Sequence, residues 1–112
     1  MTNIVIKMDN TFEIKLCEKS AIDQVDFNNI VFGKVFSDHV FFMNYEDGEW
    51  KRGVIEPFGP MSISPASMVF HYGQAIFEGM KAYRQQDGSV SLFRPGDNIN
   101  RFNLSAKRMS MP

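Results

Sequence analysis

The sequence predicts an α+β fold, with a mixed, mostly antiparallel sheet and a few helices. Two observations carry this prediction. Short runs of alternating apolar and polar residues, bounded by turn residues, are typical of antiparallel strands. Two further segments combine a helix-starting residue with an apolar face and predict helices between or after the strands. At 112 residues the chain is long enough to bury a core, and we expect one domain across residues 1–112.

The first half of the chain predicts two hairpins. Apolar residues occupy every second position of residues 4–8 and again of residues 12–16, on either side of a DNT turn. A second hairpin is expected from HVFFMNY (39–45), through the turn EDGEW, to GVIEPFG (53–59).

A short helix is expected in SPASMVFHYG (64–73). Ser64 can cap its start, Pro65 suits the first helical position, and Gly73 can end it. The following AIFEGMKAYR (75–84) is interpreted as an extended strand, with Gly79 as its weak point. The turn QQDGS then leads into the strand SVSLF (89–93), which completes a third hairpin.

The last predicted element is a helix in RPGDNINRFNLSAKRMSMP. Asp97 is a good N-cap for it. Its apolar face is expected to comprise Ile99, Phe102, Ala106 and Met109.

Composition excludes several classes of function. A net charge of −1 with interspersed signs gives no footprint for nucleic acid, and no apolar run approaches membrane-spanning length. The single Cys17 predicts a reducing compartment, for which the cytoplasm fits best. His39 and His71 are the only histidines and have no second ligand at metal-binding spacing, so no metal site is expected.

Local pattern leaves the remaining candidates open. Arg101 lies in the first turns of the last helix, where it can bind an anion or simply be solvated. Phe32, Tyr72 and Phe77 can each be core or pocket residues. Pairs such as Glu78 with Lys81, or Asp87 with Arg84, fit ion pairs or solvated charges better than an acid/base dyad.

Three segments taken together resemble the N-terminal part of branched-chain amino acid aminotransferases, the pyridoxal-phosphate enzymes of fold type IV. They are FGKVFSDHVF, SPASMVFHYGQAIFEGMKAYR and SVSLFRPGDNINRFNLSAKRM, in the order and spacing of that family from Phe32 to Pro112. The joint pattern of FEGMKAYR, LFRP, N-x-x-R and SA-x-R is long and specific. Residues before Phe32 match only loosely.

The resemblance implies site residues and partners. Arg101 falls on the arginine that binds the cofactor phosphate, and Phe32 and Phe77 fall on apolar residues around the substrate side chain. Tyr72 falls on a tyrosine that serves the site of the adjacent subunit, which implies a homodimer or higher homo-oligomer. The implied substrates are small-molecule amino acids and 2-oxo acids; no nucleic acid or membrane partner is implied.

The resemblance also implies that residues 1–112 are an incomplete N-terminal small domain. The lysine that carries the cofactor belongs to the C-terminal domain in this family, and Lys81 and Lys107 match positions that are not catalytic. We therefore expect no catalytic residue in this chain and no transaminase activity from it alone. Two alternatives stay open: another fold type IV enzyme, such as a D-amino acid aminotransferase or aminodeoxychorismate lyase, and a non-catalytic binding or dimerisation module.

Overall fold

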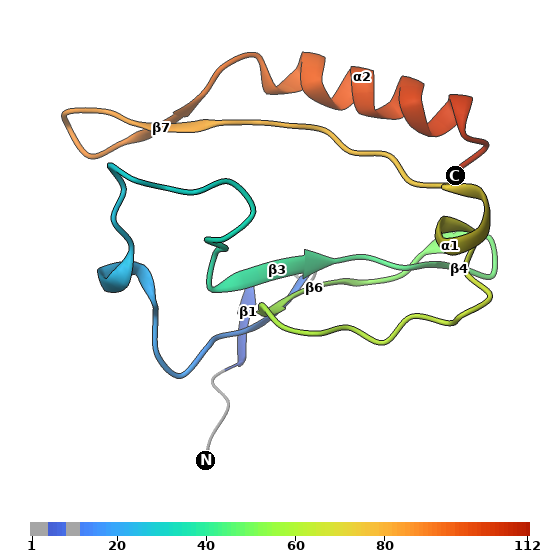
Figure 1. Ribbon diagram of the computed structural model, residues 1–112, viewed down its shortest axis with the longest axis horizontal. Helices are drawn as coiled ribbons and strands as arrows, with labels where there is room; N and C mark the ends of the chain where they lie inside the picture. The colour runs from blue at the N-terminus through green and yellow to red at the C-terminus, as the bar shows by residue number, and fades with distance from the viewer. Residues whose placement is uncertain (1–4, 9–11) are drawn as a thin grey trace. The chain divides into compact units, whose positions relative to one another are not determined.

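The computed structural model describes residues 5–8 and 12–112. It divides the chain into two compact units, residues 1–61 and 62–112 (Figure 1), and each is described by itself. Strands dominate the first unit, whereas the second combines a hairpin with two helices. The predicted α+β class, with mostly antiparallel pairing, is confirmed.

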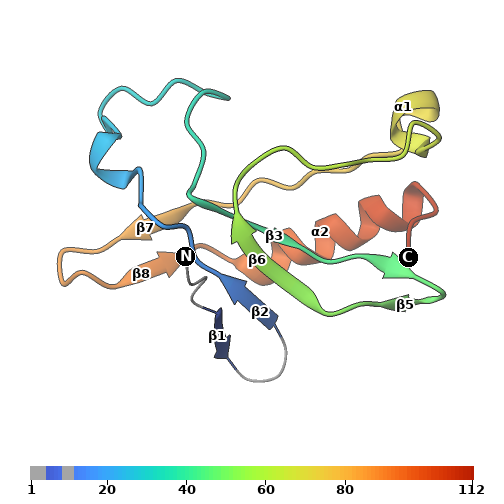
Figure 2. The same ribbon diagram turned by 90° about the horizontal axis from the view of Figure 1, so that it is seen from below.

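The first unit contains a four-stranded sheet, a two-stranded sheet and one turn of 3-10 helix. Its elements are β1 (Val5–Met8), β2 (Phe12–Lys15), η1 (Ile22–Gln24), β3 (His39–Phe42), β4 (Tyr45–Glu46), β5 (Glu49–Trp50) and β6 (Gly53–Pro57). The larger sheet has the strand order β1-β2-β6-β3 (Figure 2). Its central pair, β2 with β6, is parallel, and the two outer pairs are antiparallel.

Both hairpins predicted for the first half of the chain are present. β1 pairs with β2 in the register Val5↔Lys15 to Met8↔Phe12, while Ile4 and the predicted DNT turn lie outside the described residues. β3 pairs with β6, but β3 ends at Phe42 rather than at residue 45. The chain between them makes its own small hairpin, β4–β5, whose turn residues Asp47 and Gly48 have positive φ values of 55° and 81°.

Gly53, the first residue of β6, allows two phenylalanine rings to meet over the sheet. A Cβ atom there would lie 2.5 Å from Phe41 Cε2 and 3.0 Å from Phe12 Cδ1. The two rings meet edge to face, with centroids 5.5 Å apart. Gly53 is buried, but no hydrophobic side chain of residues 12–112 is fully shielded from solvent, so the expected buried core is not formed within them.

The second unit begins with α1 (Met68–Tyr72), and here the predicted helix start is wrong. The N-cap is Ser67, not Ser64. Ser64 makes a separate turn instead: its carbonyl accepts a hydrogen bond from Ser67 N at 3.0 Å, and its Oγ accepts one from Ala66 N at 3.2 Å. The predicted end is confirmed, because Gly73 caps the helix in the left-handed conformation at φ 59°.

A third hairpin joins β7 (Ala82–Arg84) to β8 (Val90–Leu92), as predicted, with Arg84 opposite Val90. The predicted strand over residues 75–84 is wrong at its start, since only its last three residues pair. β8 is three residues long and offers no partner to residues 75–81. Side chains of the last helix hold this segment instead: Asn98 Nδ2 donates a 2.9 Å hydrogen bond to the carbonyl oxygen of Gly79.

The last helix, α2 (Pro95–Arg108), starts earlier than predicted. Its N-cap is Arg94, because Pro95 occupies the first helical position and presets its backbone angle. Asp97 is therefore in the first turn and not a cap, and its carboxylate accepts a 2.5 Å contact from Arg94 Nε. Of the predicted apolar face, Ala106 and Met109 are half-buried, but Ile99 is 50% and Phe102 37% exposed.

Candidate functional site

An ion pair between Glu78 and Arg101 is the centre of the candidate site. Glu78 belongs to the extended segment after α1, and Arg101 lies two turns into α2. Arg101 Nε donates to Glu78 Oε2 at 2.6 Å, and Nη2 donates to Oε1. The contact is bidentate, which is the strongest common geometry for a guanidinium and a carboxylate.

Two further donors complete the surroundings of the Glu78 carboxylate. Oε1 accepts a hydrogen bond from Gly79 N at 2.9 Å and one from Asn98 Nδ2 at 3.2 Å. Arg101 first, and Asn98 and the Gly79 amide after it, lower the pKa of Glu78 from its ordinary 4.5 to about 2 against the opposing effect of desolvation. Glu78 in turn raises the pKa of Arg101. Both groups are charged at neutral pH.

The two partners differ sharply in exposure. The Glu78 side chain is 11% exposed, whereas that of Arg101 is 68% exposed. The carboxylate is thus held inside, and the rest of the guanidinium faces outward. Because α2 begins at Pro95, the amide of Arg101 lies beyond the unpaired amides of the first turn. An anion at Arg101 would be bound by the guanidinium, and not by the helix N-terminus as local pattern suggested.

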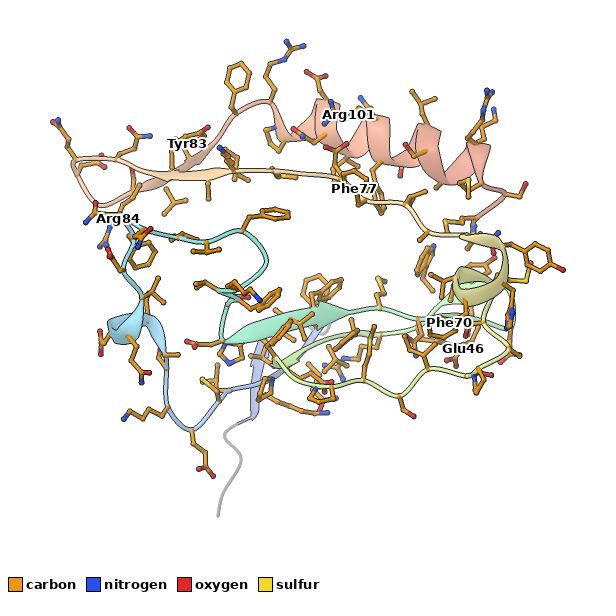
Figure 3. The ribbon with its side chains drawn as sticks, viewed as in Figure 1. Glu46, Phe70, Phe77, Tyr83, Arg84 and Arg101 are labelled. Atoms are coloured by element: carbon orange, nitrogen blue, oxygen red, sulfur yellow. The ribbon has the colours of Figure 1, made fainter. Side chains whose placement is uncertain are left out.

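Arg101 borders a shallow apolar recess of the second unit. Figure 3 shows Arg101 on α2 beside the segment that carries Phe77. The recess is lined by Ala75, Ile76, Phe77, Arg101, Leu104, Ser105, Arg108 and Met109. It combines two guanidinium groups with an apolar wall, which suits an anionic group attached to an aromatic or aliphatic body. The Ser105 hydroxyl donates its proton to the Arg101 carbonyl oxygen at 3.1 Å.

The aromatic residues expected at a substrate wall are strongly exposed. Phe77 is 92% exposed, Tyr72 76%, and Phe32 100%. None of them is a core residue of its own unit, so the simple core interpretation is wrong for all three. Phe77 lies in the recess with Arg101, Tyr72 ends α1, and Phe32 belongs to the first unit. Their roles toward a substrate stay predictions.

The sequence left ion pairs or solvated charges open for Glu78 with Lys81 and for Asp87 with Arg84, and neither ion pair is present among the described residues. Glu78 pairs with Arg101 and not with Lys81. Asp87 accepts hydrogen bonds from Ser89 N at 2.9 Å and Ser89 Oγ at 2.7 Å, which lower its pKa, and it does not pair with Arg84 among the described residues. Asp87 therefore stabilises the β7–β8 turn.

In the first unit, ligand atoms of Cys17, Asp38 and His39 lie within 4.8 Å of one another. Hydrogen bonds within the unit already use the His39 ring, the Asp38 carboxylate and the backbone amide of Cys17. His39 Nε2 accepts from Cys17 N at 2.9 Å, and Asp38 accepts from Ser20 Oγ at 2.6 Å and Ala21 N at 2.9 Å. The bonds from Ser20 and Ala21 lower the pKa of Asp38. The bonds from Ser20 and Ala21 to Asp38 connect the residues before η1 to the residue before β3.

Sequence reasoning proposed a site role for Arg101, considered Glu78 only together with Lys81, and gave no role to Asn98. A signal was present in the three-residue spacing of Asn98 and Arg101, which places both side chains on one face of a helix. Their common partner is 23 positions away from Arg101, and only the fold brings it close.

Comparison with known proteins identifies relatives of this chain. It is 52% identical over 91 residues to branched-chain-amino-acid transaminase 1 of Bacillus subtilis, covering 80% of this chain and 26% of that protein. It is 46% identical over 94 residues to the chloroplastic branched-chain-amino-acid aminotransferase 5 of Arabidopsis thaliana, covering 83% and 23%. A probable branched-chain-amino-acid aminotransferase of Staphylococcus aureus is 42% identical over 106 residues, covering 94% and 29%. No protein-family model matches the chain.

These relatives are all aminotransferases by name, and the chain is homologous to that class. More particularly, it is homologous to branched-chain-amino-acid aminotransferases, so the resemblance inferred from FEGMKAYR and the later motifs is confirmed. The chain spans about a quarter of the length of the curated relatives it matches. Among the described residues, neither helix has the length and apolar character needed to cross a membrane.

Proposed function

We propose that this chain is the front portion of the small domain of a branched-chain amino acid aminotransferase of fold type IV. The whole enzyme would transfer the amino group of leucine, isoleucine or valine to 2-oxoglutarate. The observation that carries the proposal is the identity of 42–52% over most of the chain to proteins with that name. The lone cysteine and the absence of a basic patch in the sequence favour a cytoplasmic enzyme acting on small molecules.

The implied cofactor is pyridoxal phosphate, and the residues around Arg101 fit its phosphate. Arg101 would hold the phosphate through a charge-assisted contact, with Arg108 in the same recess. When bound, the cofactor supplies the carbonyl and the electron-withdrawing ring through which an amino group is transferred.

The apolar residues of this chain would shape the substrate pocket. The exposed ring of Phe77 stands in the recess beside Arg101, where it would exclude water from an aliphatic side chain. Phe32 would add a second apolar wall, and Tyr72 would serve the site of an adjacent subunit. The lysine that carries the cofactor would lie outside these 112 residues, so the chain alone would not transfer amino groups.

The decisive experiment reads the gene beyond the codon for Pro112 and assays the complete product. We expect a second domain with a suitable lysine, and turnover of L-leucine with 2-oxoglutarate. Strong activity on D-alanine with none on L-leucine would favour a D-amino acid aminotransferase, and release of pyruvate from aminodeoxychorismate would favour the lyase. A stop codon directly after Pro112 would leave a non-catalytic binding or dimerisation module.

Replacing the proposed phosphate ligand gives a second test. In the complete enzyme, Arg101→Ala should reduce pyridoxal-phosphate affinity by at least tenfold, because a charge-assisted contact to phosphate is lost. Equilibrium dialysis followed by absorbance of the retained cofactor measures this. Arg84→Ala is the matched control, because Arg84 lies in β7 and lines neither recess that Arg101 borders. Equal losses in both variants would contradict the role given to Arg101.

The proposed homodimer predicts self-association of the chain. The segment from Phe70 to Phe77 exposes large apolar surface, with Phe70 at 61%, Tyr72 at 76% and Phe77 at 92%. Multi-angle light scattering should show species larger than a monomer of 12.9 kDa. A monodisperse monomer at 100 µM, on the order of typical assay concentrations, would count against this surface as an interface.

A further inference from the structure

We propose that Glu78 is a positioning residue that fixes the guanidinium of Arg101 so that its outer edge is presented to a phosphate group. The inference rests on the proposed function in one respect, since it takes the ligand of Arg101 to be a phosphate. It gives Glu78, which the sequence analysis considered only together with Lys81, a role toward Arg101.

The first argument is the division of donors on the guanidinium. Arginine carries five N–H donors in a rigid plane: one on Nε and two on each Nη. Glu78 uses the edge formed by Nε and Nη2. Within residues 12–112 the hydrogen bonds donated by the Arg101 side chain end there, which leaves the edge formed by Nη1 and Nη2 for a second bidentate contact. That edge matches the oxygens of a phosphate.

The second argument is the direction of this edge. Because Glu78 is 11% exposed and Arg101 is 68% exposed, the carboxylate holds the inner side of the guanidinium and the outer side faces the solvent. Arg101 lines both the recess with Phe77 and a neighbouring one with Arg94 and Asn98. The outer edge is thus available to a ligand without breaking the pair.

The third argument is that Glu78 is itself immobilised. Gly79 N and Asn98 Nδ2 hold Oε1, and Asn98 Nδ2 also donates to the Gly79 carbonyl oxygen at 2.9 Å. Asn98 and Arg101 both come from α2, so the helix fixes the carboxylate and the carboxylate fixes the guanidinium. A long flexible arginine that is already oriented loses less conformational freedom when an anion binds.

A purely electrostatic view makes the opposite prediction. A carboxylate beside Arg101 cancels its charge, so removal of Glu78 should strengthen anion binding if charge alone matters. Positioning predicts weaker binding instead. Two substitutions separate the effects. Glu78→Asp keeps the negative charge, but its side chain is one methylene too short to reach the guanidinium. Glu78→Gln keeps the shape, but its NH₂ group replaces one carboxylate oxygen and cannot accept a hydrogen bond from Arg101.

The experiment titrates inorganic phosphate into the full 112-residue chain and follows the Arg101 Nε–Hε signal by NMR. We expect a slowly exchanging signal that shifts saturably with phosphate in the unmodified chain. Glu78→Asp should weaken phosphate binding at least fivefold and Glu78→Gln at least threefold, and both should make the Nε–Hε proton exchange rapidly. The Arg101 side chain is then free to rotate, so phosphate binding has to restrict that rotation and the affinity falls.

Asp87→Asn is the matched control, because it removes one negative charge from the second unit at a residue that lines neither recess that Arg101 borders. Its phosphate affinity should be unchanged or slightly higher. Unchanged affinity in Glu78→Asp, or tighter binding in Glu78→Gln, would overturn the positioning role. No phosphate shift at Arg101 in the unmodified chain would overturn it as well. If the complete enzyme does not use L-leucine, the proposed function is wrong, but the phosphate titrations still test the positioning role of Glu78.

Discussion

The two units of the chain are stabilised in different ways. In residues 1–61, backbone ladders connect four strands, and the rings of Phe12 and Phe41 meet over Gly53. In residues 62–112, only a three-residue hairpin pairs by backbone, and side chains such as Asn98 and Arg101 connect α2 to the segment before β7. Strand pairing therefore connects the elements of the first unit, whereas side-chain hydrogen bonds from α2 hold the extended segment of the second unit.

The largest effect on stability is expected at Gly53, where a side chain would come closest to its neighbours. Gly53→Val should lower the free energy of unfolding of this unit by about 2–3 kcal/mol, because the new side chain meets Phe41 Cε2 and forces the ring aside. Chemical denaturation followed by circular dichroism measures the change. Gly59→Val is the matched control, since a Cβ there has no atom within 4 Å. Equal losses in both variants would show that ring packing over Gly53 does not hold the sheet.

A smaller effect is expected in the second unit, from the end of α1. Gly73→Ala should cost about 1 kcal/mol, because a side chain disfavours the left-handed conformation at φ 59°. Hydrogen exchange of the α1 amides would report the loss locally. In Gly79→Ala, where nothing lies within 4 Å of the new Cβ, exchange should be unchanged. Faster exchange in Gly79→Ala than in Gly73→Ala would contradict this account of the cap.

The smallest effect is expected from acid titration of Glu78 in the second unit. Glu78 has a folded-state pKa of about 2, below its ordinary 4.5, so its ion pair stabilises the second unit fully above pH 4.5. That contribution is lost as the pH falls from 4.5 towards 2. The Glu78 carboxyl carbon shift, followed by NMR, should titrate near pH 2.

Substitution of Arg101 or Asn98 should raise the pKa of Glu78 by different amounts. Arg101→Ala should raise the pKa of Glu78 more than Asn98→Ala does, because Arg101 is the largest cause of the lowering. The pKa of Asp38 in the first unit is lowered by Ser20 and Ala21, and should not respond to either substitution. A larger shift with Asn98→Ala would contradict the assigned hierarchy.

The helix boundaries show what sequence could and could not predict. Gly73 ended α1 as expected, because left-handed caps depend on one local residue. The starts were misjudged at both helices: Pro65 lies in a turn before Ser67, whereas Pro95 is the true first residue of α2. A serine or aspartate near a proline offers two alternative caps, and packing of the segment selects between them.

At the candidate site, too, local features could be predicted from the sequence and contacts between distant residues could not. Arg101 was proposed as a site residue because its motif is specific, and the β7–β8 hairpin was predicted correctly because its turn residues act locally. Glu78 and nearby Lys81 were interpreted as an ion pair or as solvated charges, since nothing in a linear pattern brings residue 78 to residue 101. The extended segment before β7 was taken for a strand because apolar alternation does not reveal whether a partner strand exists.

The parallel pairing of β2 with β6 constrains the order in which the first unit assembles. Lys15 and Glu56, whose side chains meet across these strands, are 41 positions apart in the chain. β3 and β6 are nearer in sequence and can close first through the small β4–β5 hairpin between them. Closing the longer loop costs more entropy, so the β1–β2 hairpin should dock last and set the folding rate of the unit.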